Sequence, residues 1–238
     1  MSRLNLTLLG LAGALLVSGC ADTTEIDNKP VATVSEPAKE APAAEKADDK
    51  AAPAEAGQAA GAAVMDPETA KAPEGDAWTS DASSTIEFLG AKVSKTHTGG
   101  FKTFTGEAVS KDGKVIFTKF VVQTDSIWAD AGDYSAKLTG HLKDPDFFDV
   151  AKFPTAAFAS TKIEHGDNGA ATITGNLKFI DVTKEITFPA TFTEADGKVM
   201  AKADFQINRK DWGLDYKGKA DDLVKDEVAL NLALTFTK

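Results

Sequence analysis

The sequence has little of the residue chemistry on which enzymes and cross-linked domains depend. It contains one cysteine and three histidines in 238 residues, so an intramolecular disulfide is excluded. It has no Gly-x-Ser-x-Gly nucleophile motif, no glycine-rich phosphate loop, and no histidine near serine and aspartate in a recognisable order. Nucleophilic catalysis and nucleotide binding therefore lack their usual residues. We predict a protein that is not an enzyme and that needs no cofactor.

Long apolar runs are also missing, apart from one near the N-terminus. Arg3 precedes an uncharged apolar stretch from Leu4 to Val17, and two small residues then lead to Cys20. The stretch is shorter than the about 20 residues that a transmembrane helix needs, and it is typical of a cleaved secretory signal. It resembles a bacterial lipoprotein signal. The resemblance implies that residues 1–19 are removed and that the Cys20 thiol carries a diacylglycerol anchor.

The anchor determines where the protein is expected to lie. A lipidated Cys20 places it on the periplasmic side of a bacterial envelope membrane, whereas the alternative is a plain signal peptide with an incidental cysteine. Ala21 stands where an aspartate often marks retention in the inner membrane. The outer membrane is therefore the favoured destination.

Aromatic residues are absent between Ala21 and Ala77, and six of the nine prolines lie in this segment. It carries 13 acidic and 5 basic residues, for a net charge of −8. Such a composition buries too little apolar surface to offset the entropy lost on ordering. We predict that residues 20–77 are a disordered linker between the anchor and the folded part.

All aromatic residues lie within residues 78–238, a length that predicts one folded domain. Its apolar residues recur with a period of two, which is typical of strands with one buried face. In the last segment, for example, Val228, Leu230 and Leu232 alternate with Ala229 and Asn231. The predicted strand segments are 83–93, 99–110, 114–128, 153–165, 170–180, 186–193, 198–207 and 228–237.

The connections between these segments indicate antiparallel neighbours. Asp112–Gly113 and Asp196–Gly197 are typical of tight hairpin turns. Residues 133–149 break the strand period and show helical spacing, so a short helix and a loop are expected to cap one mouth. We predict an all-β fold, an eight-stranded antiparallel barrel with this cap. The net charge of −3 over residues 78–238 gives a nucleic acid little to bind.

Four separated motifs occur in order within the folded part. They are Gly140–Val150 with Phe153–Pro154, Gly175–Leu177 with Val182–Lys184 and Ile186, Asn208–Gly213, and Asp226–Val228. Together with the opening segment from Asp81 to Gly106, they resemble the YceI-like family. The resemblance implies a lipocalin-like barrel, periplasmic in most members, that binds a long isoprenoid chain such as a polyprenyl or quinone tail. Ser83 departs from the histidine that many members have, and the stretch Lys137–Gly140 departs from a common Arg-Asp pair.

A barrel of eight strands is either filled by side chains or encloses one slim ligand. Small inward residues favour a cavity, and these are Gly175, Ala190, Ala201 and Ala203. The alternative is that they only let large neighbours interdigitate. From strand phase and the cap we predict that the ligand contacts are Phe88, Phe120, His141, Leu142, Phe147, Phe148, Phe158, Leu177, Phe179, Phe188, Phe192, Phe205, Trp212, Leu230 and Leu232.

Few polar residues are candidates for a specific role. His141 either hydrogen-bonds a ligand head group, such as a quinone carbonyl, or braces its own loop. His97 and His165 lie near glycine turns and are expected to face solvent. Arg209 is expected to pair with Asp211, and the alternative is recognition of an anionic head group.

The acidic cluster Asp144, Asp146 and Asp149 lacks the glycine and distal glutamate of a calcium-binding loop, so no metal site is predicted. The favoured hypothesis is a lipid-anchored carrier or storage protein for an isoprenoid lipid or quinone. The competing hypothesis is a filled barrel without a ligand, acting as an interaction or stress-protective module of the envelope. A homodimer is compatible with either hypothesis.

Overall fold

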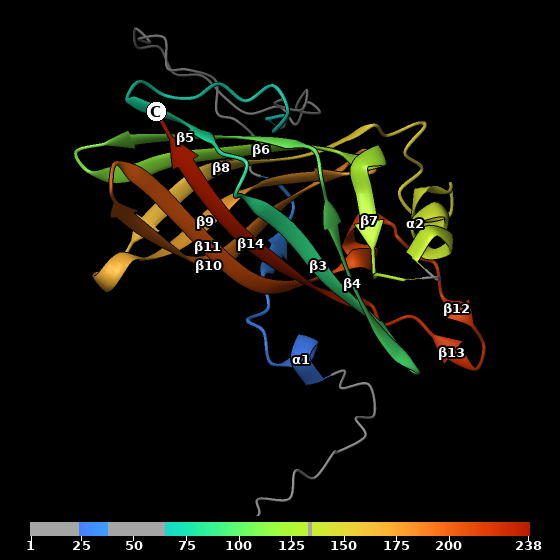
Figure 1. Cartoon of the computed structure of the whole chain (residues 1–238). Helices are drawn as coiled ribbons and strands as arrows, with labels where there is room; N and C mark the ends of the chain where they lie inside the picture. Colours follow the sequence, from blue (N-terminus) through green and yellow to red (C-terminus); the bar gives the residue numbers. More distant parts are fainter. Residues whose placement is uncertain (1–23, 38–64, 133–134) are drawn as a thin grey trace, which may run out of the picture.

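The computed structural model describes residues 24–37, 65–132 and 135–238, and most of these residues lie in strands (Figure 1). The strands are β1 (Thr33–Ser35), β2 (Asp76–Ser80), β3 (Thr85–Lys92), β4 (Lys95–Phe101), β5 (Phe104–Lys111), β6 (Lys114–Gln123), β7 (Ile127–Ala129), β8 (Thr155–His165), β9 (Ala170–Phe179), β10 (Val182–Ala195), β11 (Lys198–Asn208), β12 (Gly218–Lys219), β13 (Asp222–Leu223) and β14 (Glu227–Thr237). The helices are α1 (Thr24–Asp27), α2 (Ser135–Lys143) and the short 3₁₀ turns η1 (Thr124–Ser126), η2 (Asp167–Gly169) and η3 (Arg209–Trp212).

Eight of these strands close into an antiparallel barrel, which confirms the predicted fold. The hydrogen-bonded order runs β10, β9, β8, β6, β5, β2 and β14, and β11 joins β14 back to β10. β2 and β3 both pair with the same edge of β14, β2 near the C-terminal end of β14 and β3 further back along it. β4 then pairs with β3, and β7 pairs with β4. The barrel is therefore regular at one end and splayed at the other.

Two segments predicted as single strands are each divided. The segment 99–110 becomes the end of β4 and β5, and the segment 114–128 becomes β6 and β7. η1 separates β6 from β7, where the hydroxyl of Thr124 donates to the carbonyl of Phe153 at 2.6 Å. The breaks turn β4 and β7 away from the closed barrel, and this opens space at that end.

The predicted hairpin turns at Asp112–Gly113 and Asp196–Gly197 are present, and they lie at the regular end of the barrel. All four residues have positive φ, between 53° and 72°. Two consecutive residues with positive φ form the turn whose twist matches that of the flanking strands. Glycine at the second position avoids the steric cost of a side chain there.

The linker predicted for residues 20–77 needs correction in two places. In the first, β1 pairs with β10, and Ile26 of α1 is fully buried against Ala91 and Ala229 on the outside of the barrel. In the second, residues 65–70 pack on the outer face of the barrel through Ala70, and β2 begins at Asp76 rather than after residue 77. Residues 20–23, which include Cys20, and residues 38–64 of the predicted linker lie outside the described residues.

The helix and loop predicted over residues 133–149 are present as α2 and the turns that follow it. Figure 1 shows α2 and the β12–β13 hairpin near the splayed end, away from the β5–β6 hairpin turn. Within the described part of the chain, no helix has the length and apolar character needed to cross a membrane.

Candidate functional site

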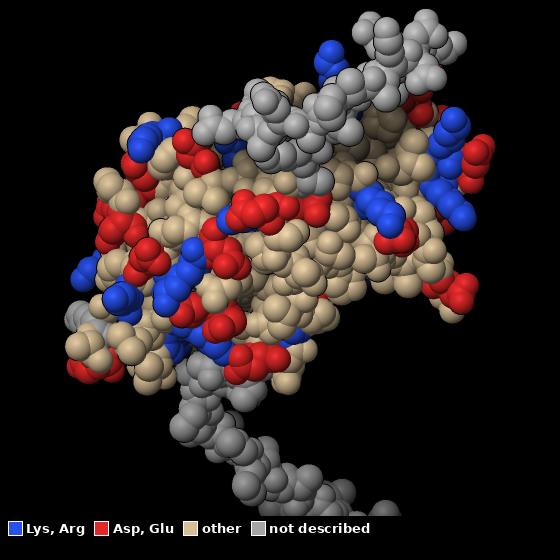
Figure 2. Space-filling model, turned by 180° about the vertical axis from the view of Figure 1, so that it is seen from behind, with Lys and Arg blue, Asp and Glu red and all other residues tan. Residues whose placement is uncertain are grey.

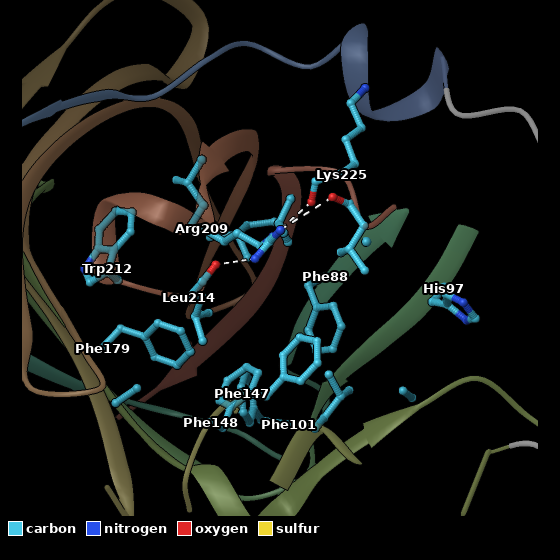
Figure 3. A pocket seen from close by; sticks show the side chains of 18 of the residues that line it. Phe88, His97, Phe101, Phe147, Phe148, Phe179, Arg209, Trp212, Leu214 and Lys225 are labelled. Carbon is cyan, nitrogen blue, oxygen red and sulfur yellow. Dashed lines mark hydrogen bonds between the residues drawn. The ribbon is translucent and has the colours of Figure 1, made fainter. Parts of the chain in front are cut away.

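A cavity of about 820 Å³ occupies the splayed half of the barrel (Figure 3). It reaches the surface beside the exposed side chains of Lys95 and Lys137, at an opening that we call the mouth. Phenylalanine, leucine, isoleucine and alanine side chains form most of its wall. Ligand pockets typically measure about 300–1,000 Å³ and are mostly apolar, so this cavity can enclose a small molecule or a lipid chain.

Aromatic rings close the inner end of the cavity. Phe188 stacks on Phe205 with ring centroids 4.2 Å apart, and Phe158 lies 5.6 Å from Phe188. Phe120 lies beside Phe158, with centroids 6.4 Å apart. Phe120, Phe158 and Phe188 also border a void of about 20 Å³ on their other side. They form the floor between the cavity and the packed half of the barrel.

The cap positions further rings at the mouth. The hydroxyl of Thr139 on α2 accepts from the backbone N–H of Ala129 at 3.0 Å, which fixes α2 on β7. Phe148 then lies edge-on to Phe179, with centroids 4.7 Å apart, and contacts Phe101 at 5.8 Å. The cap therefore joins the apolar wall of the cavity rather than only covering it.

His141 lies at the mouth, as the sequence predicts. Its Nε2 is 3.0 Å from a carboxylate oxygen of Asp146, and its ring lies edge-on to Phe147 and Tyr216 at centroid distances of 5.1 and 4.9 Å. The imidazole thus braces its own loop, through the side chain of Asp146. It also borders the cavity, where a ligand head group would meet it.

The predicted pair between Arg209 and Asp211 is wrong. Arg209 lies in η3, where strand alternation does not apply, and its Nη2 donates to Asp226 at 3.0 Å. The guanidinium also donates to the carbonyls of Lys225, at 3.0 Å, and Leu214. The side chain is 5% exposed. Arg209 therefore braces the segments that form one side of the mouth, and Figure 3 shows its bonds to the carbonyls of Lys225 and Leu214.

The prediction that His97 and His165 face solvent is wrong. The Nδ1 of His97 in β4 is 2.7 Å from Asp130, which Lys95 also contacts at 3.1 Å. Burial raises the pKa of Asp130, but the hydrogen bonds from His97 and Lys95 outweigh it and hold the pKa below its usual value. His165 donates from Nε2 to the carbonyl of Val115 at 2.7 Å. Both rings are half-buried braces.

Most of the charged side chains at the rim of the mouth lie in ion pairs. Besides the group around Asp130, Lys92 pairs with Asp222, Lys225 pairs with Asp27 and Lys210 joins Arg209 at Asp226. Neutralised pairs around an apolar cavity favour a ligand with an apolar chain and a small polar end. They give no large excess of one charge to select a highly charged ligand.

The predicted contacts line this cavity with one exception. Phe192 lies in the packed half, beside His165 and the small void, so the prediction that it contacts a ligand in the cavity is corrected. Ala190, Ala201 and Ala203 border the same void and do not open the cavity. The alternation along a strand predicts which side chains point into the barrel. It does not predict how far along the barrel each of them lies.

Gly175 has a different role from the one predicted. A Cβ atom built on Gly175 would lie 2.5 Å from the Phe158 ring. It would lie equally close to the carbonyl oxygen of Ala159, so the missing side chain accommodates the β8 backbone and Phe158 at the floor rather than a ligand.

Sequence reasoning missed several lining residues, among them Phe101, Tyr216, Leu214 and Leu138. Leu138 shares the helical spacing of the cap, so that signal was present. Tyr216 lies between η3 and β12, in a stretch without a periodic pattern of apolar residues. Only the fold brings its ring to His141.

No group of three or more histidine, cysteine, aspartate and glutamate residues is placed to hold a metal ion within residues 24–37, 65–132 and 135–238. Figure 2 shows acidic and basic side chains interspersed over the described part of one face, without a broad field of one sign.

Solved structures share this architecture. Burkholderia cenocepacia BcnA has a TM-score of 0.58 at 21% identity, covering 65% of this chain and 96% of BcnA. A Campylobacter jejuni YCEI protein has a TM-score of 0.50 at 20% identity, covering 59% and 84%. At these identities the likeness concerns the fold alone.

Sequence relatives extend the comparison. A UPF0312 protein of Pseudomonas fluorescens (strain SBW25) is 32% identical over 135 residues, which are 54% of this chain and 67% of that protein. A UPF0312 protein of Pseudomonas putida (strain GB-1) is 36% identical over 102 residues, which are 42% of this chain and 50% of that protein. The chain thus spans about half the length of the Pseudomonas putida relative. The family model for the YceI-like domain matches residues 78–236, and the chain therefore belongs to the YceI-like family.

Proposed function

We propose that this chain binds the apolar tail of an isoprenoid lipid, such as a polyprenyl or quinone tail, and carries or stores it at the bacterial envelope. The observation that carries the proposal is the apolar cavity of about 820 Å³, with an aromatic floor and a mouth framed by ion pairs. A slim chain lies along the cavity while its polar end stays at the rim near His141. Acylation of Cys20 holds the protein on the membrane that supplies the lipid.

The energetics favour a long tail. Burying one CH₂ group contributes about 0.8 kcal/mol, so an isoprene unit of five carbons contributes up to about 4 kcal/mol. Association costs roughly 4–15 kcal/mol in lost freedom. A single unit therefore hardly offsets this cost, and affinity is expected to rise steeply over the first few units. It then levels off when the cavity is full.

The competing hypothesis of a filled barrel predicts a densely packed lumen. Only the half that contains Phe192 and Phe236 fits that description, because the other half holds the cavity. No serine, threonine or cysteine is among the described residues that line the cavity, and most of its charged residues are paired, such as His97 with Asp130 and Arg209 with Asp226. A binding protein is the function that these features support.

The test begins with the chain from Ala21 onward, exported to the periplasm behind an ordinary signal peptide and purified without detergent. Native mass spectrometry and solvent extraction should find an isoprenoid in stoichiometric amount. Leu232→Glu places a carboxylate in the cavity wall and should abolish lipid retention. Asn231→Glu, at an exposed neighbouring position of β14, is the matched control. An empty parent protein that also takes up no quinone or polyprenol would refute the proposal.

A further inference from the structure

Two apolar side chains are strongly exposed beside each other at a projecting tip. Val93, in the turn between β3 and β4, is 70% exposed, and Leu223, in β13, is 51% exposed. The backbone N–H of Val93 donates to the carbonyl of Leu223 at 3.1 Å, so the two residues are neighbours. Single exposed apolar residues are ordinary in proteins. A neighbouring pair of exposed apolar residues at a tip is less common, because the two side chains together present one apolar surface.

The tip borders the mouth of the cavity. Lys92, Asp222 and Val224, which flank the two apolar residues in the chain, all line the cavity. The Lys92 ammonium pairs with the Asp222 carboxylate, and Asp222 also accepts from the backbone N–H of Ser94 at 3.1 Å. These bonds hold the β3–β4 turn against the β12–β13 hairpin. The apolar pair is thus fixed in position rather than free to fold back.

The N-terminal segment reaches the barrel beside the same rim. Ile26 of α1 is buried against Ala91, which lines the cavity, and Asp27 pairs with Lys225, which also lines it. Figure 3 shows α1 next to Lys225. Cys20 is only four residues before Thr24 in the sequence. Four residue steps span at most about 14 Å, which bounds the distance between an anchor on Cys20 and Thr24.

We propose that the mouth docks directly on a phospholipid bilayer, with Val93 and Leu223 inserted into its interfacial region. The apolar tip and the apolar cavity then share one side of the molecule, and α1 contacts the barrel at Ala91 and Lys225 beside them. Lipid passes between the bilayer and the cavity without crossing water. The inference deepens the proposed function and rests on it for the anchor and the cargo. The docking itself is measured without reference to cargo.

The direct test uses the full chain, acylated at Cys20 and reconstituted in vesicles of phosphatidylethanolamine with a minority of phosphatidylglycerol. Because Cys20 is the only cysteine and its thiol carries the diacylglycerol, L223C provides a single free thiol for an environment-sensitive fluorophore. The label should show a blue shift and a several-fold gain in emission in vesicles. I116C is the matched control, since Ile116 is 39% exposed on β6 near the β5–β6 turn at the other end of the barrel. No blue shift at position 223, or an equal shift at 116, overturns the proposal.

A second measurement uses the chain from Ala21 onward, without the anchor, in a vesicle sedimentation assay. Each apolar side chain withdrawn from the bilayer should weaken binding about tenfold. V93D and L223D together should therefore lose about a hundredfold, and I116D should lose nothing. Equal loss in I116D overturns the proposal, as does binding that appears only in native envelope membranes, because a protein partner is then responsible.

The outcomes separate the two proposals. Tip-dependent insertion in a protein that retains no isoprenoid supports docking and refutes the proposed cargo. Retained isoprenoid without insertion at position 223 supports the cargo and refutes docking. Circular dichroism and the melting temperature verify folding, which these exposed substitutions should leave intact.

Discussion

Replacing Arg209 with methionine should destabilise the protein strongly, because its guanidinium is a buried structural brace. Methionine keeps a long unbranched side chain but removes every donor. The change would leave the carbonyls of Lys225 and Leu214 without their partner, and it would remove the bond to Asp226. The bond to the carbonyl of Val224, at 3.5 Å, is long and contributes little.

The magnitude follows from what is left unpaired. Each buried polar group without a partner costs about 1–3 kcal/mol, and two such carbonyls remain. Asp226 is one-third exposed and keeps Lys210, so it adds little. We expect R209M to lower the free energy of unfolding by about 3 kcal/mol, within the range of about 3–5 kcal/mol for breaking a buried ion pair.

Lys210 provides the matched control. It neighbours Arg209 and contacts the same Asp226 at 2.7 Å, but its side chain is 41% exposed. An exposed pair contributes about 0–1 kcal/mol, so K210M should be nearly neutral. Urea unfolding followed by the fluorescence of tryptophan, including the buried Trp212, measures both values. If R209M unfolds within about 0.5 kcal/mol of the parent but loses its lipid, Arg209 recognises a head group and the bracing argument is refuted.

Three further predictions concern the docked segments and the floor. Burial raises the pKa of Asp66, but hydrogen bonds from the Glu68 backbone and Lys178 outweigh it and leave the pKa below its usual value. The docking of residues 65–70 should therefore be strongest above the ordinary pKa of about 3.9 and weaken as the pH falls through the lower folded value. Hydrogen exchange should show this, and D66N should remove the pH dependence. I26A should speed proteolysis between residues 24 and 37 without changing the melting of the barrel, whereas V31A, at a position 72% exposed, should not; equal cleavage in both variants would contradict the docking. G175A should displace the β8 backbone at Ala159 as well as the Phe158 ring, and so lower both the melting temperature and the lipid load. G90A should lower neither, because a Cβ atom on Gly90 meets nothing within 4 Å, and equal lipid loads would contradict the assigned role of Gly175.

The barrel and most of its inward face could be predicted from the sequence, because period-two alternation depends only on local geometry. Val228, Leu230 and Leu232 alternate with outward residues, and all three line the cavity. Depth along the barrel could not be predicted in the same way. Phe192 and Phe188 share a strand face, but only Phe188 borders the cavity. Their difference depends on where β4 and β7 leave the barrel.

The docked segments could not be predicted for a related reason. Residues 24–37 have the composition of a linker, and their apolar anchor is the single residue Ile26. Its binding site combines Ala91 of β3 and Ala229 of β14, which are far apart in the sequence. Composition averages over a segment and does not detect one side chain that fits one groove. Acidic linker residues such as Asp27 likewise become specific only when Lys225 is placed opposite them.

Lys225 connects the docked segment to the cavity. Its backbone N–H donates to the carbonyl of Ala91 at 2.8 Å, its carbonyl accepts from Arg209 at 3.0 Å, and its ammonium pairs with Asp27. One residue therefore joins α1, β3 and η3 at the rim of the mouth. A displacement of the N-terminal segment therefore acts on the rim through these bonds. The docked segment and the mouth should accordingly respond together when either is perturbed, while the packed half around Phe236 stays unchanged.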